Sequence, residues 1–239
     1  MIFHQFFDKV SFTYTYLVST GKGREALIID PVIENTVNYL KILKDLDLKL
    51  VKVIDTHTHA DHISGMKELK NQTGCLALMG EHSKSEIVNL HVKDNEKIKI
   101  ENIELTSMYT PGHTDCSYSF LMNDRVFTGD TLLINGTGRT DFQNGSSYDA
   151  YDSLFNKLLK LPEKTLVYPA HDYNGKTHST IESEKSNNPR LQVKSAEEYA
   201  DIMSNLKLSN PKMMDITVTA NKKGATLQDL ENRWFKLQL

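Results

Sequence analysis

The most informative segment of the sequence is Thr56-His57-Thr58-His59-Ala60-Asp61-His62, which follows the β-branched segment Leu50–Ile54. That segment is predicted to be a strand. At a strand end His57 and His59 point to the same side, because side chains repeat every two residues. Asp61 and His62 follow where the chain turns into a predicted helix. Imidazole nitrogens and a carboxylate converging there favour a divalent-cation site over a hydrogen-bonded surface loop.

Three further candidate residues each follow a predicted strand. They are His113 in Thr110-Pro111-Gly112-His113-Thr114, Asp130 in Phe127-Thr128-Gly129-Asp130-Thr131, and His171 in Tyr168-Pro169-Ala170-His171-Asp172. Loops at strand ends that converge on one edge are where α/β folds place their sites. Each residue alone is weak evidence, but together with the first cluster they complete a set of metal ligands.

The composition is that of an ordinary globular protein with a sizeable core. In 239 residues, 39% are hydrophobic and the net charge is −3, which excludes whole-chain disorder and gives no basic footprint for nucleic acid or an anionic membrane. Cys75 and Cys116 cannot form a disulfide framework. We find no signal peptide and no apolar run long enough to span a bilayer. The expected location is the cytoplasm, although a processed organelle protein would share these features.

Predicted strands arrive in runs, with helices between some of them. The predicted strands are 14–19, 25–29, 50–54, 76–79, 98–100, 103–109, 118–122, 126–128, 165–168 and 214–219. The predicted helices are 35–46, 62–71, 148–161 and 197–206. This order favours two sheets with helices outside over a doubly wound parallel sheet. We expect one domain over residues 1–239, with no role assigned to the tail at 210–239.

The ordered set His57-x-His59-x-Asp61-His62, His113, Asp130 and His171 resembles that of the metallo-β-lactamase superfamily. The resemblance implies an α/β fold, an αββα sandwich of two mixed sheets with helices on the outer faces and the metal site along one sheet edge. Members of the superfamily hydrolyse lactams, thioesters and phosphodiesters or perform redox chemistry, so the fold does not choose the reaction.

Three later segments narrow the resemblance to one family. They are Gly129–Gln143, Tyr168–Gly175 and Ser179–Leu191, and the string Gly138-Arg139-Thr140-Asp141-Phe142-Gln143 is the most discriminating part. These segments resemble the persulfide dioxygenase (sulfur dioxygenase) family, whose members oxidise glutathione persulfide with O2 to sulfite and glutathione. The resemblance covers about Gln5 to Leu191.

The family resemblance implies one Fe(II) per chain, with two zinc ions as the alternative. The ligands would be His57, His113 and Asp130, which leaves positions open for O2, substrate or water. The remaining motif groups would orient these ligands or hold a second metal. They are His59, Asp61, His62 and His171.

The substrate carries two carboxylates, so the resemblance also implies cationic anchors. Arg139 and Arg190 are the candidates, because a guanidinium pairs bidentately with a carboxylate, and a surface ion pair is the alternative for each. Tyr173, two residues after His171, would place its hydroxyl near the substrate or the iron.

The alternative function is a glyoxalase II-like hydroxyacylglutathione (thioester) hydrolase with a binuclear metal site. It would use the same ligands and a metal-activated hydroxide. Such hydrolases carry a helical C-terminal extension, whereas Met214–Thr219 is predicted to be a strand, which favours the dioxygenase. A non-catalytic metal-binding module is a third possibility. A homodimer with contacts through the tail would also fit the family resemblance.

Overall fold

The computed structural model describes residues 1–209 and 214–237, without the side chains of residues 215 and 233–237. Two six-stranded sheets form its centre. The first sheet has the order β1-β2-β3-β4-β5-β6. Its strands are β1 (Ile2–Phe7), β2 (Tyr14–Ser19), β3 (Glu25–Ile29), β4 (Lys49–Ile54), β5 (Leu76–Gly80) and β6 (Leu90–Val92). The pairs from β1 to β3 are antiparallel and those from β3 to β6 are parallel, so this sheet is mixed.

The second sheet is also mixed, with the order β14-β13-β10-β9-β8-β7. Its strands are β7 (Lys97–Ile100), β8 (Ile103–Tyr109), β9 (Tyr118–Leu121), β10 (Arg125–Gly129), β13 (Leu166–Pro169) and β14 (Ser179–Thr180). Only β10 and β13 pair in parallel within it. A two-stranded ribbon of β11 (Leu132–Leu133) and β12 (Gly136–Thr137) follows β10.

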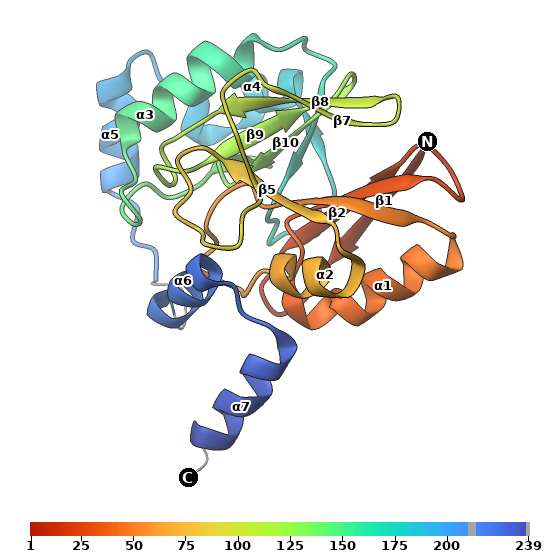
Figure 1. The fold of residues 1–239 in the computed structure, drawn as a ribbon. Helices are drawn as coiled ribbons and strands as arrows, with labels where there is room; N and C mark the ends of the chain where they lie inside the picture. Colours follow the sequence, from red (N-terminus) through yellow and green to blue (C-terminus); the bar gives the residue numbers. More distant parts are fainter. Residues whose placement is uncertain (210–213, 238–239) are drawn as a thin grey trace.

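Helices cover the outer faces of both sheets, as Figure 1 shows. The first sheet carries α1 (Thr36–Asp45) and α2 (Met66–Thr73), and the second carries α3 (Ser147–Asp152), α4 (Ile181–Asn187) and α5 (Ala196–Ser204). Single helical turns at 153–160 extend α3. At the C-terminal end α6 (Met214–Lys223) lies against the body, while α7 (Leu227–Leu237) points away from it (Figure 1). Among the described helices, none combines the length and apolar character needed to cross a membrane.

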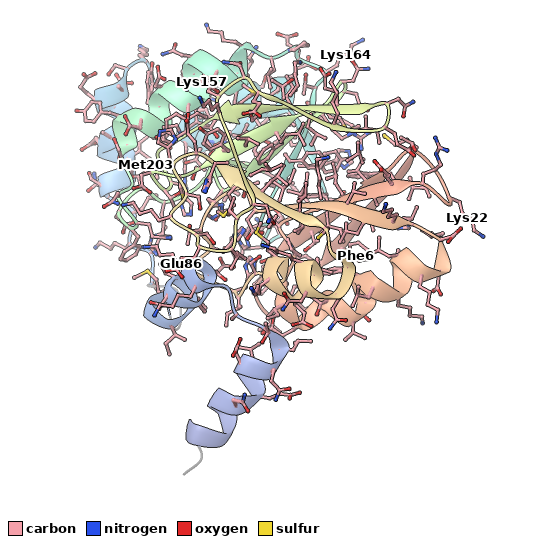
Figure 2. The ribbon with its side chains drawn as sticks, viewed as in Figure 1. Phe6, Lys22, Glu86, Lys157, Lys164 and Met203 are labelled. Atoms are coloured by element: carbon pink, nitrogen blue, oxygen red, sulfur yellow. The ribbon has the colours of Figure 1, made fainter. Side chains whose placement is uncertain are left out.

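The core lies in three layers because both faces of each sheet are covered. On β2, Tyr16 and Val18 face the space between the sheets, whereas Leu17 between them faces the helices. This two-residue alternation with both faces buried explains the nearly continuous apolar strands. Side chains fill the space between the layers (Figure 2). The predicted αββα sandwich of two mixed sheets is confirmed.

Two predicted elements need correction. The strand predicted at Met214–Thr219 is wrong, since these residues begin helix α6. The helix predicted from His62 begins only at Met66, because residues 57–64 form the loop that carries the clustered histidines. Three edge strands, β1, β6 and β14, and the ribbon of β11 and β12 were not predicted from the sequence.

Candidate metal centre

Every strand-end residue singled out from the sequence lies at the same edge of the sandwich. His57 follows β4, His113 follows β8, Asp130 follows β10, and His171 follows β13. Because β10 and β13 run in parallel, their carboxyl ends meet at this edge. The loops therefore bring together side chains that are more than a hundred residues apart in the chain.

The first group consists of His57, His113 and Asp130, whose nearest ligand atoms lie within 4.8 Å of one another. The Asp130 Oδ2 atom lies 3.5 Å from Nε2 of His113 and 4.0 Å from Nε2 of His57. The opposite ring nitrogens are already engaged, Nδ1 of His57 with Thr56 Oγ1 at 2.9 Å and Nδ1 of His113 with the Arg139 carbonyl oxygen at 2.8 Å. The two Nε2 atoms are thus left to face the carboxylate.

The second group lies beside the first and comes close to the Asp130 carboxylate of that group. It consists of His59, Asp61, His62 and His171, again with one ligand atom each within 4.8 Å. Nε2 of His171 lies 3.4 Å from Oδ2 of Asp61 and 3.7 Å from Oδ1 of Asp130. Asp130 therefore stands between the two groups.

The pattern of unpaired atoms fits a metal ion at this place. Within the described residues, four buried side-chain atoms have no hydrogen-bond partner, and three belong to these groups: His59 Nδ1, His62 Nε2 and Asp130 Oδ1. An unpaired buried polar atom is costly unless a further ligand satisfies it. Two imidazole nitrogens and a carboxylate oxygen are a donor set that divalent transition metals accept.

The protonation states also fit metal binding, which requires neutral imidazole and ionised carboxylate. Burial, together with the neighbouring histidines, holds the pKa of His57 and of His59 well below the usual value. Burial opposes ionisation of Asp61, but His171 and His62 outweigh it and hold the pKa of this carboxyl well below its usual range. His57, His59 and Asp61 are therefore in the required form. Although burial opposes it, Asp61 raises the pKa of His62 to about 9, and Asp130 and Asp61 raise the pKa of His171, so these two imidazoles would release a proton on binding a metal.

A buried carboxylate behind the first loop, Asp30, was missed by the sequence analysis. Its Oδ1 accepts a hydrogen bond from the backbone N–H of Thr56 at 2.7 Å and lies 3.2 Å from Nε2 of His59. This contact leaves Nδ1 of His59 facing the site. The signal in the sequence is Asp30-Pro31, directly after the predicted strand 25–29.

Comparison with known proteins agrees with this geometry. Residues 8–101 and 80–171 match the family model of the metallo-β-lactamase superfamily. The human protein named persulfide dioxygenase ETHE1, mitochondrial, is 42% identical over 226 residues, which are 93% of this chain and 88% of that protein. The chain belongs to the persulfide dioxygenase family of this superfamily.

A solved structure and a hydrolase relative place this family membership in context. The crystal structure of ETHE1 from Myxococcus xanthus matches with a TM-score of 0.90 and 46% identity, over 93% of this chain and 98% of that one. A hydroxyacylglutathione hydrolase from Dictyostelium discoideum is 33% identical over 185 residues, 73% of this chain and 68% of that protein. The likeness to persulfide dioxygenases is therefore both higher in identity and longer.

Of the substrate residues expected for a persulfide dioxygenase, Arg139 contacts the site through its backbone, while its guanidinium is engaged by other residues. Its guanidinium pairs with both oxygens of Asp141, at 2.6 and 2.7 Å, and lies 4.2 Å from the ring centroid of Phe142. Its carbonyl oxygen accepts from His113. At the end of the same string, Gln143 Nε2 donates to the carbonyl oxygen of Thr58 at 2.8 Å. The discriminating string thus contacts both the His113 loop and the first histidine loop.

The other two expected substrate residues lie on loops near this string and near His171. Arg190 is half-buried, and its guanidinium donates to the carbonyl oxygen of Thr137. Tyr173 stacks on His171, with ring centroids 6.1 Å apart and planes 7° apart, and remains 64% exposed. Desolvation of its hydroxyl, with Asp130 and Asp61 nearby, raises the pKa of Tyr173, so the phenol stays protonated.

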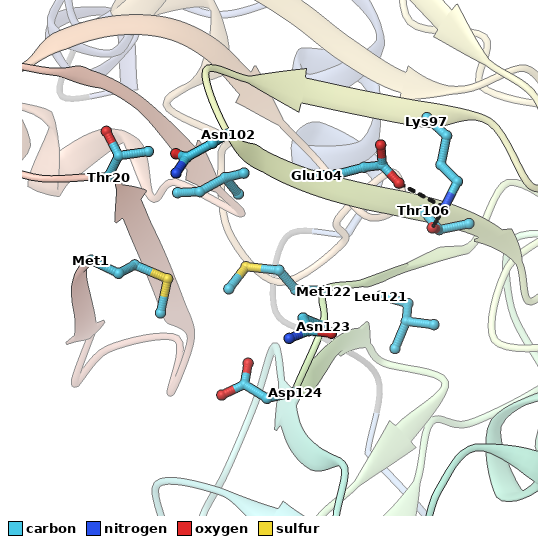
Figure 3. A pocket seen from close by; sticks show the side chains of 11 residues that line it. Met1, Thr20, Lys97, Asn102, Glu104, Thr106, Leu121, Met122, Asn123 and Asp124 are labelled. Atoms are coloured by element: carbon cyan, nitrogen blue, oxygen red, sulfur yellow. Dashed lines mark hydrogen bonds and ion pairs between the residues drawn. The ribbon is translucent and has the colours of Figure 1, made fainter.

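A pronounced hollow of the surface lies elsewhere. It measures about 790 Å³ and is lined at the start of β8 and at the turn before β10, the opposite ends of these strands from the metal centre (Figure 3). Within it Lys97 pairs with Glu104 at 2.8 Å. Its lining holds no histidine or cysteine, so it offers none of the chemistry gathered at the other edge.

Proposed function

We propose that the protein is an Fe(II)-dependent persulfide dioxygenase that oxidises glutathione persulfide with O2 to sulfite and glutathione. The observation that carries the proposal is the group of two histidines and one carboxylate, His57, His113 and Asp130, in a chain 42% identical to a human persulfide dioxygenase. In balance, persulfide, O2 and water give thiol, sulfite and two protons, with four electrons passing from sulfur to O2.

The chain's own residues would divide the work as follows. His57, His113 and Asp130 would hold one iron. Iron in such a site supplies a redox-active centre with adjacent open positions for O2 and a sulfur ligand. The Asp61 carboxylate and the imidazoles around it would orient these ligands and exchange protons with the substrate. The residues around Asp61 in this role are His59, His62 and His171.

We propose that the guanidinium groups of Arg139 and Arg190 bind the glutathione carboxylates. Arg139 would exchange its bidentate pair with Asp141 for one with the substrate. Tyr173, protonated and exposed beside His171, would donate its hydroxyl to bound substrate. Substrate would therefore enter on the side of the site where Tyr173 stacks on His171.

A second candidate function is a binuclear hydroxyacylglutathione hydrolase. The second group, His59, Asp61, His62 and His171, favours it, because these side chains could hold a further metal next to Asp130. The C-terminal segment does not count against the hydrolase, because Met214–Lys223 is a helix and not the predicted strand. The higher identity and longer coverage of the persulfide dioxygenases favour the first candidate.

Metal analysis combined with two assays separates these functions. The purified protein is assayed for metal content, for O2 consumption with glutathione persulfide, and for cleavage of a glutathione thioester. One iron per chain with stoichiometric sulfite supports the dioxygenase. Two zinc ions per chain with thioester cleavage and no O2 uptake would replace it with the hydrolase.

Three further expectations remain proposals. We propose that residues 1–239 act as one domain, and that two copies form a homodimer. Gel filtration of a form shortened at residue 226 tests whether α7 contributes to such a dimer. The cytoplasmic location stays a prediction, because the human and mouse relatives are named as mitochondrial, and fractionation of the source cells tests it.

A further inference from the structure

The C-terminal helix α6 reaches back to the loop that carries the clustered histidines. Asn221, which is 8% exposed, donates from Nδ2 to the carbonyl oxygens of His59 and His62, both at 2.9 Å. Its Oδ1 accepts from the backbone N–H of Ser64, also at 2.9 Å. One side chain thus bonds three backbone groups within six residues of the loop.

The helix adds a second contact of the same kind one turn earlier. Thr217 donates from Oγ1 to the carbonyl oxygen of Ala60 at 2.6 Å. Residues four apart lie on one face of a helix, so Thr217 and Asn221 present a single polar edge to the loop. The loop from His59 to Ile63 forms neither helix nor strand, and three of its carbonyls, those of His59, Ala60 and His62, accept from side chains of α6.

The position of α6 is fixed independently from its other side. Ser85 Oγ donates to the carbonyl oxygen of Asn221 at 3.0 Å, and the backbone N–H of Glu86 donates to that of Lys222 at 2.7 Å. Figure 2 labels Glu86 beside this helix. Beyond it, the backbone N–H of Leu227 donates to Glu68 at 3.2 Å. The helix is therefore docked firmly enough to position the loop.

We propose that Asn221 is a positioning residue of the metal centre. By holding the carbonyls of His59 and His62 together, its amide sets the spacing of these two imidazoles. The ring atoms without a hydrogen-bond partner are Nδ1 of His59 and Nε2 of His62, and their positions relative to the metal depend on this spacing. The inference rests on the metal binding in the proposed function, and it gives the tail after residue 210 a role in the site.

The sharpest substitution is Asn221→Asp, which keeps the side chain's size and an acceptor for Ser64. It replaces both N–H donors with an oxygen facing two carbonyl oxygens. Groups that orient metal ligands from behind typically change metal affinity by roughly 10–100-fold. In the proposed iron site His59 and His62 are not ligands, but the ring centroid of His59 lies 4.2 Å from that of the predicted ligand His57, so a shift of the loop also moves a ligand. We expect Asn221→Asp to weaken metal binding at least tenfold, and Thr217→Val to weaken it less, because Ala60 carries no imidazole.

The experiment uses the full-length protein and Co(II), whose visible absorption reports ligand geometry. Affinity is measured by competition with a chelator, and the spectrum is recorded at saturation. The control Ser85→Ala removes a bond that holds α6 but touches no loop carbonyl, and Lys222→Ala changes an exposed side chain next to Asn221. We expect weaker binding and a shifted spectrum for Asn221→Asp, and wild-type values for both controls.

Two outcomes would overturn the proposal. One is an Asn221→Asp protein with wild-type affinity and spectrum. The other is an equal loss of affinity in Ser85→Ala, which would mean that only the docking of α6 matters. If Asn221→Asp does not fold, Thr217→Val decides. Unchanged metal affinity and an unchanged cobalt spectrum in Thr217→Val would mean that the side chains of α6 do not position the loop. If the cobalt results hold while persulfide is not oxidised, the positioning role stands and the proposed reaction falls.

Discussion

The Nδ1 atom of His113 lies 2.8 Å from the carbonyl oxygen of Arg139. A carbonyl only accepts, so Nδ1 carries the proton and Nε2 presents its lone pair toward Asp130. The backbone of the Gly138-Arg139 segment therefore selects the tautomer that a metal needs from His113. Arg139, which was expected to bind substrate, thus also orients His113, and it does so through its backbone carbonyl, which substitution of the side chain does not remove.

Gly138 allows this close approach, and Gly138→Ala should disrupt the centre. A methyl group there would overlap the carbonyl oxygen of Asp130 and come within 2.9 Å of Nδ1 of His113. Both predicted ligands would have to move, so we expect at least a tenfold loss of bound metal and of activity. Metal content per chain measures the effect. Gly136→Ala is the control, since its methyl group would meet only Leu133 at 3.9 Å, and an equal loss there would contradict the explanation.

Arg139→Ala separates the side chain's role from that of the backbone. The carbonyl bond to His113 remains, so metal content should stay at the wild-type level. Loss of a charge-assisted pair with a substrate carboxylate should raise KM for glutathione persulfide about 10- to 100-fold, with a smaller change in kcat. Steady-state O2 uptake measures both. Arg24→Ala, on an exposed arginine paired with Glu101, should leave KM unchanged, and unchanged KM in Arg139→Ala would remove the substrate role.

The motif residues could be predicted because each one follows a strand within a few positions. The strand pattern places His57, His113, Asp130 and His171 at carboxyl ends, and one sheet edge then gathers them. The sequence does not show which other groups orient them. Asp30 contacts a histidine 29 residues away, and such a pairing has no local pattern.

The error at Met214–Thr219 has a specific cause. Ile216, Thr217 and Val218 are β-branched and favour a strand by local propensity. Contacts with distant residues decide the conformation instead, because only a helix places Thr217, Ala220 and Asn221 on one buried face. The side chains of Thr217 and Asn221 bond to loop residues more than 150 positions earlier in the chain, so the tail alone could not reveal these partners.

Asp55 should make the stability of the protein depend on pH. Burial, with repulsion from Asp30, raises the pKa of Asp55 from 3.8 to about 8. Between these values the folded chain holds a proton that the unfolded chain has released, so the free energy of unfolding falls as pH rises toward 8. Asp55→Asn removes the titration and should be more stable than wild type at pH 8 by several kcal/mol, with little difference at pH 4.

Urea denaturation at several pH values between 4 and 8.5 tests this expectation. The exposed Asp45→Asn serves as the control for removing one carboxylate. Parallel curves for wild type and Asp55→Asn would show that the Asp55 carboxyl is charged in the folded protein throughout, and would contradict the raised pKa.

Substitutions in the two groups of the centre should have different effects on metal content. If one iron lies between His57, His113 and Asp130, then His113→Ala removes a ligand and should leave less than about a tenth of the wild-type metal. His62→Ala removes a group of the second cluster, so it should weaken metal binding and lower kcat but keep one metal per chain at saturation. In a binuclear centre the wild type would hold two metals and His62→Ala one.

Elemental analysis of protein purified without oxygen distinguishes these cases, and His91→Ala, on an exposed histidine of β6, controls for loss of an imidazole alone. Retention of iron by His113→Ala together with its loss from His62→Ala would mean that the metal lies in the second group, and the proposed ligand set would then be wrong.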